Sequence, residues 1–256
     1  MISVVIPTLN AESTLGPCLA ALVPAALDGV VRQVIIADGG STDQTIAIAD
    51  DAGADLVVTG PGRGQQIIAG LAEARSPWLL ILHADTILES GWEAEASGFM
   101  ESVDTGSRSI GAAAFRFKLV DAGFMPRLVD KFVHFRSTLA GLPYGDQGLL
   151  IPRRLHEEIG GYSPLPLMED IDIVRRLGRK RLTILTSCAN TSARRFLREG
   201  YIKRIVRNQI CLAMYATGTN VERIATYYRA QSAHSQGGES VSPVAENPPT
   251  PTIKPS

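Results

Sequence analysis

Short apolar runs alternate with longer amphipathic stretches along the first two-thirds of the chain. Such runs, about four to eight residues long and rich in β-branched residues, are typical of buried strands. The predicted strands cover residues 2–6, 31–37, 55–59, 78–82, 112–119, 148–151 and 182–186. Because helical patterns separate the first four, the sequence predicts an α/β fold with a mostly parallel, Rossmann-like sheet flanked by helices.

The predicted helices cover about 13–23, 43–52, 64–74, 90–101, 123–140, 153–159 and 170–178. Two C-terminal amphipathic helices follow, a basic one over 196–215 and a short one over about 220–229. In the basic helix, one face is predicted to hold Leu197, Tyr201, Ile202, Ile205, Val206 and Leu212, and the other Arg198, Lys203, Arg204 and Arg207. We expect the apolar face to pack on the core of the domain; the alternative is peripheral contact with an anionic membrane.

Composition indicates one domain. With 256 residues, 45% of them hydrophobic, the chain can bury a sizeable core over residues 1–230. Residues 231–256 are rich in Ser, Gly and Thr and hold five of the fifteen prolines, which predicts a disordered tail. Three cysteines without a CxxC motif fit a reducing compartment. With no signal-peptide pattern and no long apolar run, we expect a cytoplasmic protein, with peripheral contact at the inner membrane face as the alternative.

Charge is unevenly distributed along the chain. The net charge of −1 gives no argument for a nucleic-acid partner, and we expect none. Residues 1–60 hold seven acids and one base, whereas residues 175–207 hold eleven Lys or Arg and one acid. An acidic half facing a basic segment could hold a metal and a diphosphate between them. The alternative is a solvated basic helix face. The sequence does not indicate an oligomeric state.

The fourth predicted strand ends in His83-Ala84-Asp85. An apolar run that leads into a carboxylate predicts an acid at the carboxyl edge of the sheet, where open α/β sheets bind ligands. With the oxygens of a diphosphate, Asp85 could hold Mn²⁺ or Mg²⁺. His83 is a candidate second ligand, since imidazole suits Mn²⁺ better than Mg²⁺; the alternative is a packed, hydrogen-bonded histidine.

Polar groups also follow the first three predicted strands. The first ends in Pro7-Thr8-Leu9-Asn10-Ala11-Glu12, which lacks the glycines of an NAD-binding turn. Thr8, Asn10 and Glu12 could bond a base or ribose, or could form an Asx turn and helix cap. Asp38, in Ala37-Asp38-Gly39-Gly40, could accept from a ribose hydroxyl or a base N–H. Arg63, between glycines before a helix, could bind phosphate, although a flexible turn fits equally well.

Later segments supply further candidates. Asp146 and Gln147, between two glycines, could meet a sugar hydroxyl. Glu169 and Asp170 fit the first turn of a helix for dipole reasons, but Asp170 is also a candidate general base for an acceptor hydroxyl. Two guanidiniums after the last strand can bind diphosphate oxygens in a fork geometry; they belong to Arg194 and Arg195.

The order and spacing of these motifs resemble glycosyltransferase family 2, whose members have the GT-A fold and invert at the anomeric carbon. The resemblance covers about residues 1–215. It is carried by Pro7-Thr8-Leu9-Asn10, the segment Ala37–Asp43, the acid Asp85 and the pair Glu169-Asp170. Further pieces resemble a bacterial subgroup that includes arsenosugar-biosynthesis glycosyltransferases: Gly62-Arg63-Gly64, His83-Ala84-Asp85-Thr86, Gly145-Asp146-Gln147-Gly148, Met168-Glu169-Asp170 and Ser192-Ala193-Arg194-Arg195.

The resemblance implies a role for each matched residue. Asp38 is expected on the uracil or ribose side of a nucleotide-sugar, and Asp85 as the metal-binding acid. Asp170 is expected as the catalytic base with Glu169 beside it. The base pocket is expected to be lined by Pro7, Thr8 and Glu12, and the leaving diphosphate to be stabilised by the metal, Arg194 and Arg195.

The chain departs from the family pattern at two positions. His83 stands where the family's metal-binding element usually has its first acid, which puts the need for metal in question. Ile68 stands where the subgroup usually carries asparagine. Both departures could change how the chain contacts its donor.

These features predict a metal-dependent, inverting transferase that moves a sugar from a nucleotide-sugar, with UDP as the expected nucleotide. The acceptor is a small molecule or a membrane lipid. One alternative is a nucleotide-sugar-binding protein of the same fold with little or no turnover, which the two departures favour and Asp170 opposes. Another is a nucleotidyltransferase, which would not need a base placed like Asp170.

Overall fold

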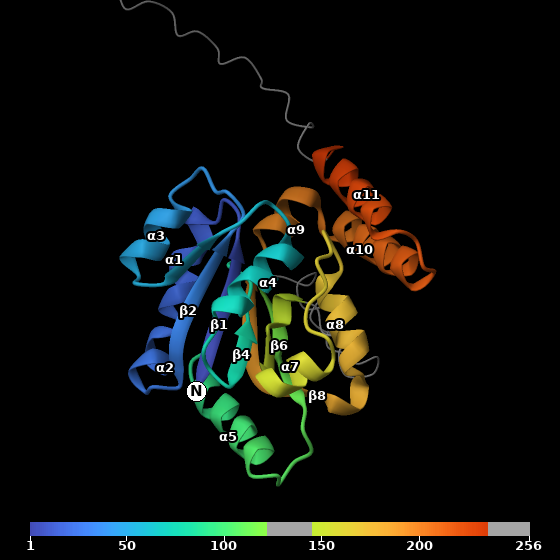
Figure 1. Ribbon diagram of the computed structural model, residues 1–256. Helices are drawn as coiled ribbons and strands as arrows, with labels where there is room; N and C mark the ends of the chain where they lie inside the picture. Colours follow the sequence, from blue (N-terminus) through green and yellow to red (C-terminus); the bar gives the residue numbers. More distant parts are fainter. Residues whose placement is uncertain (122–144, 235–256) are drawn as a thin grey trace, which may run out of the picture.

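The computed structural model describes residues 1–121 and 145–234, which form an eight-stranded sheet with helices on both faces (Figure 1). The strand order is β3-β2-β1-β4-β7-β6-β8-β5. In chain order the strands are β1 (Ile2–Thr8), β2 (Val31–Asp38), β3 (Asp55–Val58), β4 (Trp78–Ile81), β5 (Thr86–Leu88), β6 (Ala112–Val120), β7 (Leu149–Pro152) and β8 (Leu182–Ser192).

Helices connect and cover these strands. The described α-helices are α1 (Glu12–Ala20), α2 (Val23–Leu27), α3 (Thr45–Asp51), α4 (Arg63–Glu73), α5 (Trp92–Asp104), α7 (Arg153–Glu158), α8 (Glu169–Leu177), α9 (Arg194–Glu199), α10 (Tyr201–Ala216) and α11 (Val221–His234). Short 3-10 turns span η1 (Gly145–Gln147) and η2 (Arg179–Arg181). No described helix is both long and apolar enough to cross a membrane.

The pairing of the strands confirms the predicted α/β class. β3, β2, β1 and β4 pair in parallel, and β6 pairs in parallel with β8, while β7 runs antiparallel between β4 and β6. The carboxyl ends of β1, β2, β4 and β8 therefore lie along one edge of the sheet, with the amino end of β7. This edge is where segments far apart in the sequence meet.

Each face of the sheet carries an apolar layer. On one face, Trp92 of α5 is fully buried, and its ring meets Phe115 of β6 edge-on with 5.9 Å between the centroids. On the other face, Ile67 and Leu71 of α4 pack in a cluster with Val5 of β1. Alternate residues of β1 point to opposite layers, as the pleat of a strand requires.

Several element boundaries differ from the prediction. The helix predicted at 13–23 is two helices, α1 and α2. The strand predicted at 182–186 continues to Ser192, because β8 pairs with β6 along its whole length and, near its end, also with β5, a strand that the pattern missed. The short last helix continues to His234, into the predicted tail, whose remaining residues lie outside the described part, as does the helix predicted at 123–140.

The basic helix predicted over 196–215 is broken at Gly200, which has a φ of 83° and separates α9 from α10. The predicted packing of its apolar face holds for only some of its residues: Tyr201 and Ile205 pack on one apolar cluster and Leu212 on another. Arg207 and Cys211 face the body and are buried, whereas Ile202 and Val206 are 69% and 50% exposed. The buried arginine is compensated by an ion pair, which the apolar periodicity of the helix does not reveal.

The packing of α4 gives a test of the fold. A Cβ on Gly70 would lie 2.6 Å from Val5 Cγ1, whereas a Cβ on Gly98 of α5 would meet nothing within 4 Å. Helical Gly→Ala changes alone stabilise by about 0.5–1 kcal/mol, and overpacking costs about 1–3 kcal/mol. In urea titrations we expect Gly98→Ala to raise the free energy of unfolding and Gly70→Ala to lower it. Equal effects would contradict this packing.

Candidate active site

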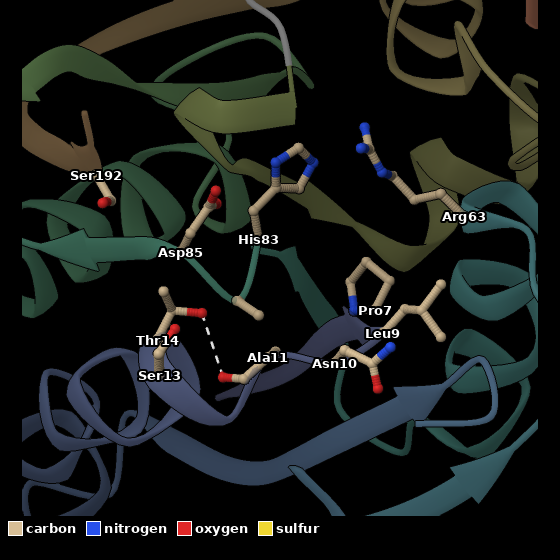
Figure 2. A pocket seen from close by; sticks show the side chains of 11 residues that line it. Pro7, Leu9, Asn10, Ala11, Ser13, Thr14, Arg63, His83, Asp85 and Ser192 are labelled. Carbon is tan, nitrogen blue, oxygen red and sulfur yellow. Dashed lines mark hydrogen bonds between the residues drawn. The ribbon is translucent and has the colours of Figure 1, made fainter. Parts of the chain in front are cut away.

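A cleft of about 530 Å³ lies at the carboxyl edge of the sheet. Figure 2 shows two walls: Asn10 of the loop after β1, with Ser13 and Thr14 at the start of α1, faces Asp85, His83 and Arg63. The cleft is also lined by Pro7, Leu9, Ala11, Ala84 and Ser192. Four separate chain segments therefore contribute to one cavity.

The cleft continues into a smaller cavity of about 130 Å³ that shares Arg63, His83, Asp85 and Ser192 with it. This second part is lined in addition by Asp146, Asp170, Met168, Thr191 and residues of α9, α10 and α11. Five of the predicted site residues thus border the same part of the cleft, although the sequence separates them by up to about a hundred residues: Arg63, His83, Asp85, Asp146 and Asp170.

Backbone strain is concentrated at this cleft. Among the described residues, the non-glycine residues with positive φ are Asn10 at 50° and Met168 at 67°. Asn10 lines the first part of the cleft and Met168 the second. Such conformations cost about 1–3 kcal/mol and cluster at functional sites. Met168 is also the residue that directly precedes α8, so it sets where the acids at the start of that helix point.

Asp38 has a structural role that the sequence did not reveal. Its carboxylate is fully buried at the end of β2 and accepts hydrogen bonds from Thr8 Oγ1 at 2.9 Å, Ser41 Oγ at 2.6 Å, Ser41 N at 2.7 Å and Gly40 N at 2.9 Å. Four donors match the lone-pair capacity of a carboxylate. Asp38 and Thr8 are not among the residues that line the cleft; their hydrogen bond joins the ends of β2 and β1 beside it.

The loops after β1 and β2 are joined by further reciprocal bonds. Asn10 N donates to Ser41 Oγ at 2.8 Å, and Asn10 Oδ1 accepts from Thr42 N at 2.9 Å. Glu12 Oε2 accepts from Gln44 N at 3.1 Å while Glu12 N donates to Asp43 Oδ2 at 3.1 Å. Asn10 remains at the cleft, whereas Glu12 serves this junction and is not among the lining residues.

Gln66 is a positioning residue that the sequence analysis missed. It is 4% exposed, and its amide donates to Thr8 O at 2.6 Å and Ala37 O at 2.9 Å. It therefore joins the ends of β1 and β2 from α4. A Cβ on Gly39 would lie 2.9 Å from its nitrogen, which explains a glycine there. The glycine that follows Asp38 is the feature of the sequence that could have indicated this close contact.

Arg63 reaches into the cleft from the first residue of α4. Its Nη1 lies 3.2 Å from Oε1 of Glu169, whose side chain is 1% exposed. Partial burial lowers the pKa of Arg63, but Glu169 and Asp170 outweigh it, and the net pKa is raised, so the guanidinium stays charged. Glu169 was predicted beside the catalytic base; in the structure it is buried, pairs with Arg63 and is not among the residues that line the cleft.

The other predicted residues divide between cleft and support. Asp146 lines the second part of the cleft, whereas Gln147 is 1% exposed and donates to Phe115 O at 2.9 Å, which ties η1 to β6. Arg194 and Arg195 begin α9, but their side chains lie outside the described part. Arg204 of α10 lines the second part; it stacks on Phe196 at 4.8 Å and pairs with Glu199 at 3.2 Å.

The side chains at Asp85 suit a metal ion whose coordination is completed by the phosphates of a bound substrate. No group of three or more His, Cys, Asp or Glu able to hold a metal occurs among the described residues. Asp85 and His83 line the cleft beside Arg63. Mg²⁺ and similar ions commonly use one or two carboxylates and complete their coordination with water and substrate phosphates. The residues present fit that arrangement and not a protein-only metal cage.

Comparison with known proteins gives a family match for part of the chain. Residues 3–117 match the model of glycosyl transferase family 2. A PGL/p-HBAD biosynthesis glycosyltransferase from Mycobacterium bovis is 37% identical over 101 residues, which span 34% of this chain and 36% of that protein. The chain thus matches little more than a third of that relative's length.

Solved structures share the fold over a longer stretch. S. aureus TarS (residues 1–349) has a TM-score of 0.58 at 17% identity, covering 92% of this chain and 71% of that one. Mycobacterium tuberculosis glucosyl-3-phosphoglycerate synthase, in complex with Mn²⁺, UDP and glucosyl-3-phosphoglycerate, has a TM-score of 0.51 at 24% identity, covering 75% and 70%. These similarities confirm the predicted GT-A type of α/β fold.

The hydrogen bonds to Asp38 predict an acid-sensitive fold. Burial raises the pKa of Asp38, but the bonds from Ser41, Thr8 and Gly40 outweigh it, and the net pKa lies below its usual value. Stability from this group is therefore present above the unfolded-state pKa of about 3.9 and lost as pH falls below it. We expect Asp38→Asn to lower the free energy of unfolding at pH 7 and to flatten its pH dependence below about pH 4. Exposed Asp50→Asn is the control and should leave that acid profile as in wild type.

The role of Gln66 predicts a contrast with its neighbour. Gln66→Met keeps the side-chain length but leaves two buried carbonyl oxygens without that donor, so we expect the free energy of unfolding to fall by about 1–3 kcal/mol. Gln65→Met, at an exposed position on the same helix, should change it by less than about 0.5 kcal/mol. Urea denaturation of both variants measures the difference, and equal values would show that Gln66 does not join the strands.

Proposed function

We propose that this chain transfers a sugar from a nucleotide-sugar to an acceptor hydroxyl, with inversion at the anomeric carbon. The observation that carries the proposal is the meeting of Asp85, Arg63 and Asp170 in one cleft at the carboxyl edge of the sheet. The family match over residues 3–117 supports a glycosyltransferase, and the UDP and Mn²⁺ in the structure of a fold neighbour support this type of donor. The arsenosugar-type subgroup and the effect of Ile68 stay predictions.

The first part of the cleft is proposed to hold the nucleotide. Pro7 and Asn10 line it on one wall, and the charged Arg63 faces them from the start of α4, where the helix N-terminus also favours anions. Asp85, with His83 beside it, would hold Mn²⁺ or Mg²⁺ against the diphosphate. That metal, when bound, supplies positive charge for the leaving group.

The second part of the cleft is proposed to hold the acceptor. Asp170, at the start of α8, lines it and is the proposed base that takes the proton from the acceptor hydroxyl. The oxygen then attacks the anomeric carbon as the bond to the diphosphate breaks, and Arg63 stabilises the departing anion. Glu169 positions Arg63 and takes no proton from the acceptor. A small molecule or a lipid remains the proposed acceptor class.

Calorimetric titration tests the donor site. We expect wild-type protein to bind UDP more tightly with Mn²⁺ than without it, and Asp85→Asn to lose most of that gain, because this carboxylate would hold the metal that offsets the charge of the diphosphate. GDP in parallel titrations tests the choice of base. Asp50→Asn should behave as wild type. Failure to bind either nucleotide would refute the assignment of the cleft.

Asp170 gives a separate test of chemistry. We expect Asp170→Asn to keep Mn²⁺-dependent UDP binding but to release UDP from UDP-sugars about 10²–10⁴-fold more slowly, since it retains the shape of the site without its base. UDP release in the presence of a panel of hydroxyl acceptors measures this. If wild-type protein binds UDP-sugar but releases no UDP with any acceptor, the alternative of a nucleotide-sugar-binding protein is favoured.

A further inference from the structure

The outer side of α10 carries an apolar stripe that the described part of the protein leaves exposed. Ile202, Val206 and Ile210 recur every four residues, so they lie on one side of the helix. They are 69%, 50% and 39% exposed. In Figure 1, α10 and α11 lie side by side at the margin of the molecule, across the sheet from α1, α2 and α3.

The inner side of α10 explains why this stripe faces outwards. Cys211 is fully buried in a cluster with Met168, Ile171 and Ile224. Arg207 is 4% exposed, lies 2.6 Å from Glu199 and stacks on Tyr228 at 4.3 Å. Since a helix can turn only one side to the body, these contacts fix the stripe on the opposite side.

The segment that carries the stripe has a net positive charge. Residues 194–216 contain six Lys or Arg and one acid, Glu199. That acid is 6% exposed and lies within ion-pair distance of Arg204 and Arg207. The described surface next to the stripe includes exposed Lys203. Arg204 and Arg207 are partly or fully compensated by Glu199, so the complementarity to an anionic lipid surface comes from the net positive charge of the segment and from exposed Lys203, where each Lys or Arg near the headgroups contributes about 1 kcal/mol.

We propose that α10 is a docking surface for anionic lipid membranes, which its stripe of Ile202, Val206 and Ile210 enters at the headgroup boundary. A second copy of the chain fits this side less well, because pairing the stripes would bring two basic segments together. The proposal deepens the proposed function: Arg204, Asn208 and Cys211 of the same helix line the acceptor part of the cleft. Docking would place that part within about 10 Å of the lipid, the diameter of one helix.

Vesicle sedimentation with the full chain tests the proposal. We expect the wild-type protein to bind phosphatidylcholine vesicles that contain phosphatidylglycerol, to bind pure phosphatidylcholine vesicles more weakly, and to lose binding as salt is raised. The double variant Ile202→Ser/Val206→Ser should bind the anionic vesicles about tenfold more weakly, because it loses two apolar side chains that would enter the lipid.

A matched control removes two exposed apolar residues elsewhere. Leu27 of α2 and Val58 of β3 are 83% and 62% exposed, so Leu27→Ser/Val58→Ser lowers surface hydrophobicity without touching α10. This control should sediment as wild type. Wild-type protein that ignores phosphatidylglycerol vesicles, or equal binding by both double variants, would overturn the proposal. So would light scattering that shows a wild-type dimer which Ile202→Ser/Val206→Ser converts to a monomer.

A second measurement separates this proposal from the proposed function. Mn²⁺-dependent UDP binding should be the same in the wild type and in Ile202→Ser/Val206→Ser, since neither side chain lines the cleft. Vesicle binding without UDP binding would refute the nucleotide site and leave the docking surface standing. UDP binding without vesicle binding would refute the docking surface and leave the nucleotide site standing.

Discussion

The cleft depends on one buried carboxylate. Asp38 ends β2 without solvent, and four hydrogen bonds satisfy it from the loop that follows and from Thr8 of the neighbouring strand. A buried anion with fewer partners would cost several kcal/mol, so the loop has little freedom to adopt another shape. Gln66 then joins the same two strand ends from α4. One wall of the cleft is therefore set by groups that do not line it.

The opposite wall is built from side chains of opposite charge that attract one another. Arg63 is surrounded by Glu169, Asp170 and Asp85, and their attraction keeps it charged in a partly buried position. One of these acids, Glu169, is buried and holds the guanidinium, whereas Asp85 and Asp170 line the cleft with it. In the proposed function, this cation serves the diphosphate and the two acids serve the metal and the acceptor hydroxyl.

The sequence predicted the edge of the sheet well and the support beneath it poorly. Asp85, Arg63 and Asp170 were found because apolar strands and glycine turns mark where strands end, and parallel strands bring those ends together. Asp38, Thr8 and Glu12 were assigned to the ligand because a short polar side chain at a strand end has the same pattern whether it faces solvent or a neighbouring loop. The donors to Asp38 include backbone N–H groups, which no side-chain pattern displays.

Helix α10 shows the limit of amphipathic patterns. Apolar periodicity predicted that Ile202 and Val206 pack inwards, but Arg207 occupies the inner side because Glu199 and Tyr228 compensate its charge. Tyr228 lies on another helix, and Glu199 reaches Arg207 only because the chain breaks at Gly200. A partner set by tertiary packing thus places Arg207 on the inner side and leaves Ile202 and Val206 exposed, while Tyr201 and Ile205 pack as the periodicity predicted.

Crystallographic analysis of the protein with UDP and Mn²⁺, using the anomalous signal of manganese, tests the central claim most directly. The account predicts a manganese peak beside the carboxylate of Asp85, with the diphosphate between it and Arg63 and the nucleoside against Pro7 and Asn10. A nucleotide bound outside this cleft, or a manganese ion held away from Asp85, would contradict it.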